Sequence, residues 1–175
     1  MITIICGTNR NLSNSYIFAK EIEALISSKQ EGCKVLNLED LPNDFAFENE
    51  VYGNENAPLN LIANKFISGS NKFVFVIPEY NGSFPGVLKA FIDSFSPDRI
   101  RGKQALLIGI ASGRAGNLRG LDHFTGVMNY LDVHVLPMKV AISHCHTLID
   151  EKSKRVSDER TIELLGQQVE TLLAS

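Results

Sequence analysis

Nine consecutive residues in the middle of the chain carry groups suited to binding a flat, partly polar ligand. They follow an apolar run over residues 73–77 and read Pro78-Glu79-Tyr80-Asn81-Gly82-Ser83-Phe84-Pro85-Gly86. Tyr80 offers an aromatic face with a hydroxyl, and Gly82 allows a close backbone approach or a positive φ. The N–H groups of this turn and of the following helix start can point at an acceptor-rich ring edge. An ordinary strand-to-helix loop, with Pro, Asn and Gly as turn formers only, has the same composition.

A second polar segment, residues 7–15, joins an apolar strand to a helix. A helix N-terminus carries unpaired N–H groups and a partial positive charge, which together attract a phosphate. Thr8, Ser13 and Ser15 add hydroxyl donors, Asn14 adds an amide, and Arg10 can make charge-assisted bonds to a phosphate dianion. Ser13 or Asn14 is also expected to cap the helix, and capping does not exclude phosphate binding.

Residues 7–15 lack the two common nucleotide motifs. Without G-x-G-x-x-G a dinucleotide Rossmann site is unsupported, and without a terminal G-K-[ST] the hydrolysis of nucleoside triphosphates is unsupported. What remains is a hydroxyl-rich loop of the kind that holds a mononucleotide phosphate in flavodoxin-like folds.

Strand-like and helix-like segments alternate along the sequence and predict how these loops are positioned. We expect strands at residues 2–6, 34–38, 72–77, 104–110 and 132–137, and helices at residues 14–28, 59–67, 87–95, 118–131 and 161–173. This rhythm predicts a single α/β domain over residues 1–175, with a five-stranded parallel sheet covered by helices on both faces. Right-handed crossovers favour a flavodoxin-like, doubly wound sheet of strand order 2-1-3-4-5. Ligands bind at the carboxyl edge of such a sheet.

The loop after the fourth predicted strand, residues 111–120, would lie beside the other two loops. Gly113 and Gly116 would allow close backbone approach there. Arg114 and Arg119 either meet the extra phosphate of NADPH or lie in solvent, and the sequence favours neither alternative.

Taken together, the three loops resemble the NADPH-dependent FMN reductase family over the whole chain. Residues 78–89 match its signature P-E-Y-N-G-S-x-P-G-x-L-K at every fixed position. Residues 7–15 match G-S-x-R-x-x-S-x-[NS], except that Thr8 replaces the usual Ser and retains the hydroxyl. The third loop keeps Ser112, Gly113 and Gly116 but lacks the paired glycines of the family.

The resemblance implies an FMN-dependent NAD(P)H oxidoreductase. Hydride would pass from NADPH or NADH to the flavin, and electrons would pass on to a quinone, an azo compound, free flavin or a similar small-molecule acceptor. The resemblance assigns the FMN phosphate to Thr8, Arg10, Ser13, Asn14 and Ser15. It assigns the isoalloxazine ring to Pro78, Glu79, Tyr80, Asn81 and Gly82, bordered by Ser112 and Gly113. We name no catalytic residue, because the cofactor carries the chemistry.

The family resemblance also implies a homodimer or homotetramer. The helix over residues 87–95, which carries Phe91 and Phe95, is either part of that interface or an inward-facing core helix.

The sequence leaves two functions other than the reductase open. A flavodoxin-type electron carrier without direct NAD(P)H reaction tends to be strongly acidic, and the net charge of −3 weakens that interpretation. A cofactor-free binding or scaffold protein would keep the fold but remain colourless.

Composition restricts the class of protein further. A hydrophobic content of 44% and a charged content of 21% are those of an ordinary soluble globular protein. The net charge gives no basic surface for nucleic acid or anionic membrane, and no apolar run approaches the roughly 20 residues of a membrane span. The N-terminus lacks the features of a signal peptide. Three cysteines without motif spacing, Cys6, Cys33 and Cys145, indicate a reducing, cytoplasmic compartment.

Each of two remaining segments can be interpreted either as part of a functional site or as an ordinary surface loop. His144 and His146, near Asp150, have a spacing that can serve zinc, but no second ligand pair appears elsewhere, so we expect a polar loop and no metal. Residues 39–58 form a long acidic irregular segment that either covers a site or is a solvated excursion, and we favour the excursion.

Overall fold

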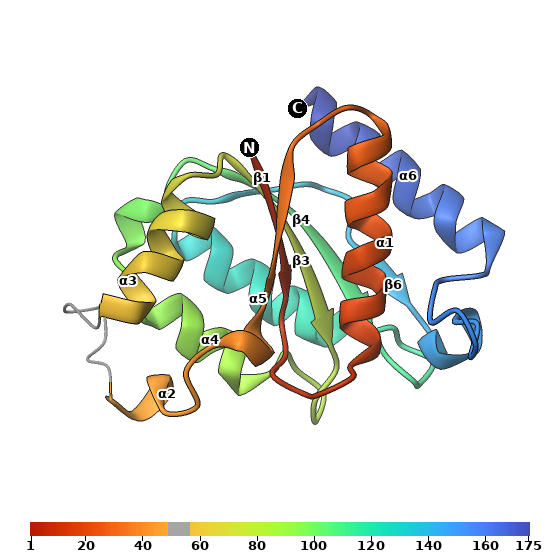
Figure 1. Ribbon diagram of the computed structural model, residues 1–175, viewed down its shortest axis with the longest axis horizontal. Coiled ribbons are helices and arrows are strands. Elements are labelled where there is room, and N and C mark those ends of the chain that lie inside the picture. Colours follow the sequence, from red (N-terminus) through yellow and green to blue (C-terminus); the bar gives the residue numbers. More distant parts are fainter. Residues whose placement is uncertain (49–56) are drawn as a thin grey trace.

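A parallel sheet forms the middle layer of the computed structural model, which describes residues 1–48 and 57–175 (Figure 1). Its strands are β1 (Ile2–Cys6), β2 (Cys33–Asn37), β3 (Lys72–Pro78), β4 (Gln104–Ile110), β5 (His134–Val135) and β6 (Val140–Ile142). The strand order is β2-β1-β3-β4-β5, with β6 also paired to β4. The predicted flavodoxin-like, doubly wound order is therefore confirmed.

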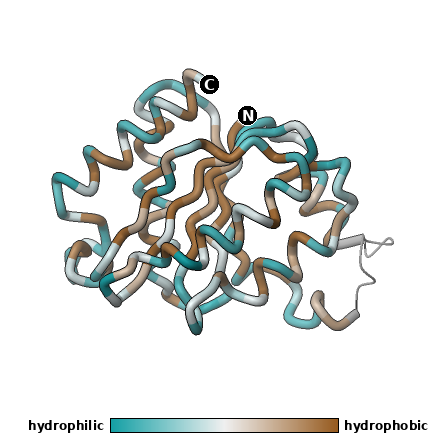
Figure 2. The backbone as a smooth tube through the Cα atoms, turned by 180° about the vertical axis from the view of Figure 1, so that it is seen from behind, coloured by the Kyte–Doolittle hydropathy of each residue, from teal (hydrophilic) through white to brown (hydrophobic). Residues whose placement is uncertain are grey.

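Helices cover both faces of the sheet. α1 (Asn14–Ser28) and α6 (Glu159–Ala174) lie on one face, and α3 (Ala57–Ala63), α4 (Gly86–Asp93) and α5 (Leu118–Tyr130) lie on the other (Figure 1). Alternate residues of β3 enter the two cores: Phe73 and Phe75 pack on the side of α4 and α5, while Val74 and Val76 pack on the side of α1 and α6. Because both faces are buried, the central strands are apolar throughout, and they form the brown centre of Figure 2.

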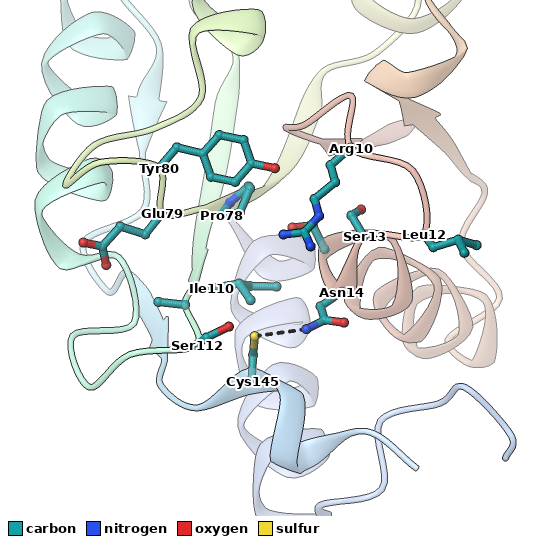
Figure 3. A pocket seen from close by; sticks show the side chains of 12 residues that line it. Arg10, Leu12, Ser13, Asn14, Pro78, Glu79, Tyr80, Ile110, Ser112 and Cys145 are labelled. Atoms are coloured by element: carbon teal, nitrogen blue, oxygen red, sulfur yellow. Dashed lines mark hydrogen bonds between the residues drawn. The ribbon is translucent and has the colours of Figure 1, made fainter. Parts of the chain in front are cut away.

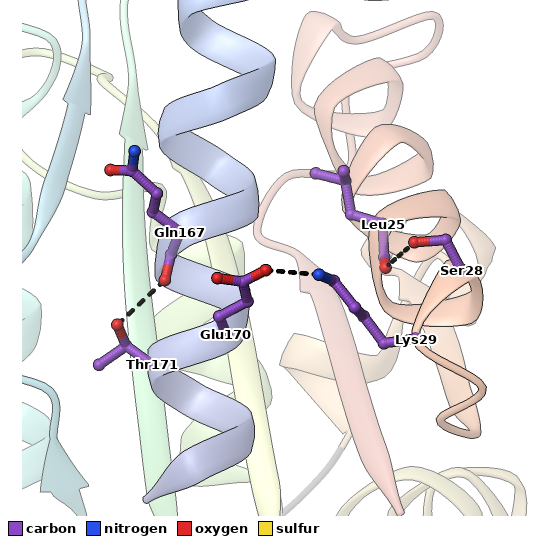
Figure 4. A network of polar contacts seen from close by, with 6 residues as sticks. All are labelled: Leu25, Ser28, Lys29, Gln167, Glu170 and Thr171. Carbon is purple, nitrogen blue, oxygen red and sulfur yellow. Dashed lines mark hydrogen bonds and ion pairs between the residues drawn. The ribbon is translucent and has the colours of Figure 1, made fainter.

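Polar contacts accompany the packing of α6 against α1 (Figure 4). Lys29 of α1 forms an ion pair with Glu170 of α6, and the Thr171 hydroxyl donates to the carbonyl of Gln167 at 3.0 Å. The ion pair is solvent-exposed, so it contributes little to stability. Burial of the apolar face of α6, including Leu165 and Val169, is the larger contribution.

The fifth predicted strand, residues 132–137, differs from the observed structure. The edge strand next to β4 is split into β5 and β6, because Ala105 pairs with Val135 whereas Ile108 pairs with Val140. Residues 136–139 therefore lie opposite only residues 106–107 of β4. Pro137 has no N–H to donate, which favours an interruption at this place. The prediction of five strands was wrong by this additional short strand.

The second predicted helix, residues 59–67, is also irregular. α3 continues into a π-helical turn, Asn64–Ser68, and Leu59, Ala63 and Ile67 are buried. The Lys103 ammonium donates to the carbonyl of Ile67 at 2.7 Å, at the end of this helical segment. Burial lowers the pKa of Lys103.

The segment predicted as an acidic excursion, residues 39–58, is described only in part. It contains the short helix α2 (Phe45–Glu48), and Leu41 and Phe45 are buried in the core, so its first part is not simply solvated. Residues 49–56 lie outside the described residues. Phe91 of α4 and Phe95, which follows that helix, are also buried, with ring centroids 5.4 Å apart, so both phenylalanines face the core and not an interface. None of the described helices is long and apolar enough to cross a membrane.

Candidate functional site

The three loops analysed above meet at the carboxyl edge of the sheet around a cavity of about 200 Å³ (Figure 3). Eight of the residues expected at the cofactor line it: Arg10, Ser13, Asn14, Ser15, Pro78, Glu79, Tyr80 and Ser112. Four others do not: Thr8, Asn81, Gly82 and Gly113. Four lining residues were not expected: Leu12, Ile110, Ala111 and Cys145.

The start of α1 offers unused hydrogen-bond donors to this cavity. Ser13 is the N-cap, and its hydroxyl accepts the N–H of Tyr16 at 3.3 Å. The N–H groups of Asn14 and Ser15 have no backbone acceptor among the described residues, and the first turn holds no acidic side chain. The partial positive charge of the helix end is therefore not neutralised by the protein, and it can stabilise an anion.

Arg10 adds a full positive charge to the same side of the cavity. Its side chain is exposed and extends from the first loop toward the start of α1 (Figure 3). Within residues 1–48 and 57–175 its guanidinium makes no ion pair or hydrogen bond, because only its backbone N–H is bonded, to the Thr8 hydroxyl at 3.2 Å. An unpaired guanidinium beside free N–H groups is suited to a phosphate.

Thr8 lies beneath the cavity and is bonded within the protein. It is fully buried, and its hydroxyl lies 2.7 Å from the hydroxyl of Tyr80. This bond joins the first loop to the second across 72 positions of sequence. Thr8 thus positions Arg10 and Tyr80 instead of lining the cavity itself.

The second loop is a tight turn bonded to itself. The N–H of Tyr80 donates to the carbonyl of Ser83 at 2.9 Å, and the N–H of Ser83 donates back at 3.1 Å. Asn81 and Gly82 between them both have positive φ, 53° and 79°, as a type I′ turn requires. The N–H of Glu79 donates to the carbonyl of Ile110. Asn81 and Gly82 therefore carry the N–H groups of this turn that remain without a backbone partner among the described residues.

Packing beneath the third loop explains its glycines. Gly116 has φ 58°, and a Cβ there would lie 2.6 Å from the carbonyl carbon of Ala141 in β6. Its close approach is therefore to the edge strand and not to a ligand. Gly113 has open space around it. The buried amide of Asn117 donates to the carbonyl of Ile77 at 2.9 Å and so holds this loop against the end of β3.

Cys145 is one of the four cavity residues that sequence analysis missed. It is buried, and its sulfur lies 3.6 Å from the Asn14 amide nitrogen, which donates to it (Figure 3). Burial raises the pKa of its thiol, and the Asn14 bond opposes this only in part. No sequence signal placed it here, because the predicted fifth strand ended at residue 137 and left its loop unpositioned.

The histidines beside Cys145 are exposed, and no group of three or more potential metal ligands comes together in the described residues. Arg114 and Arg119 are exposed as well, and neither forms an ion pair within residues 1–48 and 57–175. A Cβ on Gly82 would lie 3.6 Å from a guanidinium nitrogen of Arg119, so Arg119 rests against the second loop.

Known proteins of similar sequence identify the family of this chain. The sequence profile of the NADPH-dependent FMN reductase family matches residues 1–147. An NAD(P)H-dependent FMN reductase of Pseudomonas aeruginosa is 36% identical over 110 residues, which are 61% of this chain and 59% of that protein. A 2-hydroxy-1,4-benzoquinone reductase of a Burkholderia species is 27% identical over 67% of this chain and 73% of its own length.

Solved structures show the same fold. FerB, a flavoenzyme NAD(P)H:(acceptor) oxidoreductase of Paracoccus denitrificans, superposes with a TM-score of 0.78 at 20% identity, over 99% of this chain and 94% of its own. The fold is flavodoxin-like, and its three loops form a cavity suited to a ligand that carries a phosphate. The chain belongs to the NADPH-dependent FMN reductase family, whose cofactor is FMN and whose electron donor is NAD(P)H.

Proposed function

We propose that this chain transfers electrons from NADPH or NADH, through bound FMN, to a small-molecule acceptor such as a quinone, an azo compound or free flavin. The observation that carries the proposal is the cavity itself. At one edge of the sheet it brings together N–H groups and a guanidinium that have no partner among the described residues, and an aromatic side chain. The quinone and flavin acceptors of the named relatives support the same class of reaction.

In this proposal the start of α1 holds the cofactor phosphate. The N–H groups of Asn14 and Ser15 and the guanidinium of Arg10 would donate to it, and the Ser13 hydroxyl, which accepts from Tyr16, still has a proton to donate. Thr8 contributes indirectly, because its hydroxyl is shared between Tyr80 and the Arg10 N–H.

The ring side of the site would be formed by Pro78, Glu79, Tyr80 and Ser112, which line the cavity away from α1 (Figure 3). The free N–H groups of Asn81 and Gly82 are the donors left for ring acceptors, and Gly113 is the open position beside them. When bound, FMN supplies the hydride-accepting and electron-donating chemistry. The protein supplies orientation, and we assign no catalytic acid or base and no metal.

We further propose a cytoplasmic homodimer or homotetramer, on the basis of the free cysteines and the family resemblance. Phe91 and Phe95 cannot contribute to the interface, because they are buried within the chain.

The test is a visible spectrum of purified protein after FMN is added and the excess removed, followed by NADPH without oxygen. Retained flavin bands that bleach on addition of NADPH support the reductase. Retained bands that persist would support an electron carrier, and a protein that keeps no flavin would contradict both functions.

A further inference from the structure

A second groove, of about 490 Å³, adjoins the cavity on the side of α1. It lies between α1 and the segment over residues 146–154, and it shares Leu12, Ser13 and Asn14 with the cavity. Tyr80 and Ser112 do not border it, and Figure 3 places Leu12 beyond Ser13 as seen from Tyr80. The groove therefore continues from the phosphate end of the site and not from the ring end.

Leu12 forms the ridge between the two hollows. It has φ 51°, and 93% of its side chain is exposed. A large apolar side chain held in solvent at a left-handed position is costly, and such a feature is often found next to a binding surface. Beyond this ridge, Tyr16, Ile17 and Ile149 give the groove an aromatic and aliphatic wall, and Tyr16 is 39% exposed.

Charged side chains form the rim of the groove. Lys20 is paired with Glu23, but Lys154 makes no ion pair or side-chain hydrogen bond in the part of the chain that the structure describes. Glu151 adds a carboxylate, and His146 adds an imidazole. An aromatic wall with an ammonium and a carboxylate on the rim is suited to a nucleoside monophosphate.

We propose that the groove binds an adenosine monophosphate group continuous with the flavin phosphate, so that the protein accepts FAD as well as FMN. This inference rests on the proposed function, because it takes the flavin phosphate to lie at the start of α1. The adenine ring stacks on Tyr16, the second phosphate is attracted by Lys154, and the ribose hydroxyls donate to Glu151.

The same adenosine group occurs in NAD(P)H, but the site favours the cofactor as its source. The nicotinamide must reach the flavin ring, which is assigned to the side of Tyr80 and Ser112. The groove adjoins the opposite end of the cavity at Ser13 and Asn14, so a group attached to the flavin phosphate would enter it directly.

The experiment is calorimetric titration of the cofactor-free protein with FMN and, separately, with FAD. We expect the two dissociation constants to agree within about tenfold. Tyr16→Ala and Lys154→Glu should each weaken FAD roughly tenfold and FMN less than about twofold, given the usual strength of base stacking and of exposed charge pairs. Lys152→Glu is the matched control: it makes the same charge change two residues away, outside the groove, and should change neither affinity.

The outcomes separate the inference from the function on which it rests. Normal FMN binding with FAD weaker by more than about 100-fold overturns the groove assignment and leaves the proposed function intact. Absence of FMN binding removes the proposed function. Equal losses for both flavins in Lys154→Glu would contradict a separate adenosine site. If Tyr16→Ala or Lys154→Glu raised the KM for NADPH and left the affinity for FAD unchanged, the groove would be assigned to the electron donor and the inference would be overturned.

Discussion

Replacing Arg10 by alanine tests the phosphate end of the site most directly. The guanidinium lines the cavity and has no acidic partner among the described residues, so its removal leaves no protein charge unpaired. A charge-assisted hydrogen bond contributes about 1.5–3 kcal/mol, and solvent screening of this exposed side chain reduces the expected loss to about 1–2 kcal/mol. The dissociation constant for FMN should therefore rise about 5- to 30-fold.

The assay is fluorescence titration of FMN at low and high salt, since the contribution of Arg10 should shrink as salt screens it. Arg101→Ala is a matched control, because it removes the same charge at the opposite edge of the sheet, before β4, where only an exposed pair with Asp98 is lost. Arg10→Lys should retain part of the affinity through its charge. An FMN affinity that is unchanged in Arg10→Ala would refute the phosphate assignment.

Three further predictions concern the loops around the cavity. Gly116→Ala should destabilise the protein by about 2–4 kcal/mol in urea unfolding, because strain at positive φ adds to the clash with Ala141, whereas Gly113→Ala in open space should change stability by less than about 0.5 kcal/mol. Thr8→Val and Tyr80→Phe both remove the bond between the two hydroxyls, and Thr8→Val also removes the acceptor of the Arg10 N–H. The stability loss should be about 1 kcal/mol for Tyr80→Phe and larger for Thr8→Val, and the double variant should lose less than the sum; additive losses would contradict the bond. Alkylation at pH 8, followed by mass spectrometry, should modify Cys33 first, Cys145 second and Cys6 last, because Cys33 is the least buried and burial raises the pKa of Cys6 to about 11. Added FMN should slow the modification of Cys145 alone, since only this cysteine lines the cavity.

Much of this architecture is predictable from the sequence because the fold places strong local signals in a fixed order. The strands β1, β3 and β4 are buried on both faces. Each therefore appears in the sequence as a continuous apolar run, which is easier to recognise than an alternation of apolar and polar residues. The polar segments after those strands necessarily share one edge of a parallel sheet. Eight of the expected cofactor residues consequently line one cavity, although their contacts with a cofactor remain a prediction.

The discrepancies have physical causes that act between distant residues. The break between β5 and β6 depends on how Val135 and Val140 pair with β4, and single-sequence patterns contain little information about register. Cys145 reaches the cavity only because β6 resumes after that break. The bond between Thr8 and Tyr80 was not predicted, because Tyr80 lies 72 positions away, beyond the range of any local motif.

The bond between Thr8 and Tyr80 has a consequence for how the two sides of the cavity are held together. Two of the loops that would flank the flavin are fastened to each other, and the turn after Pro78 is closed by its own backbone. The spacing of the first and second loops is therefore set by contacts within the protein, and a change at either hydroxyl acts on both sides of the cavity at once.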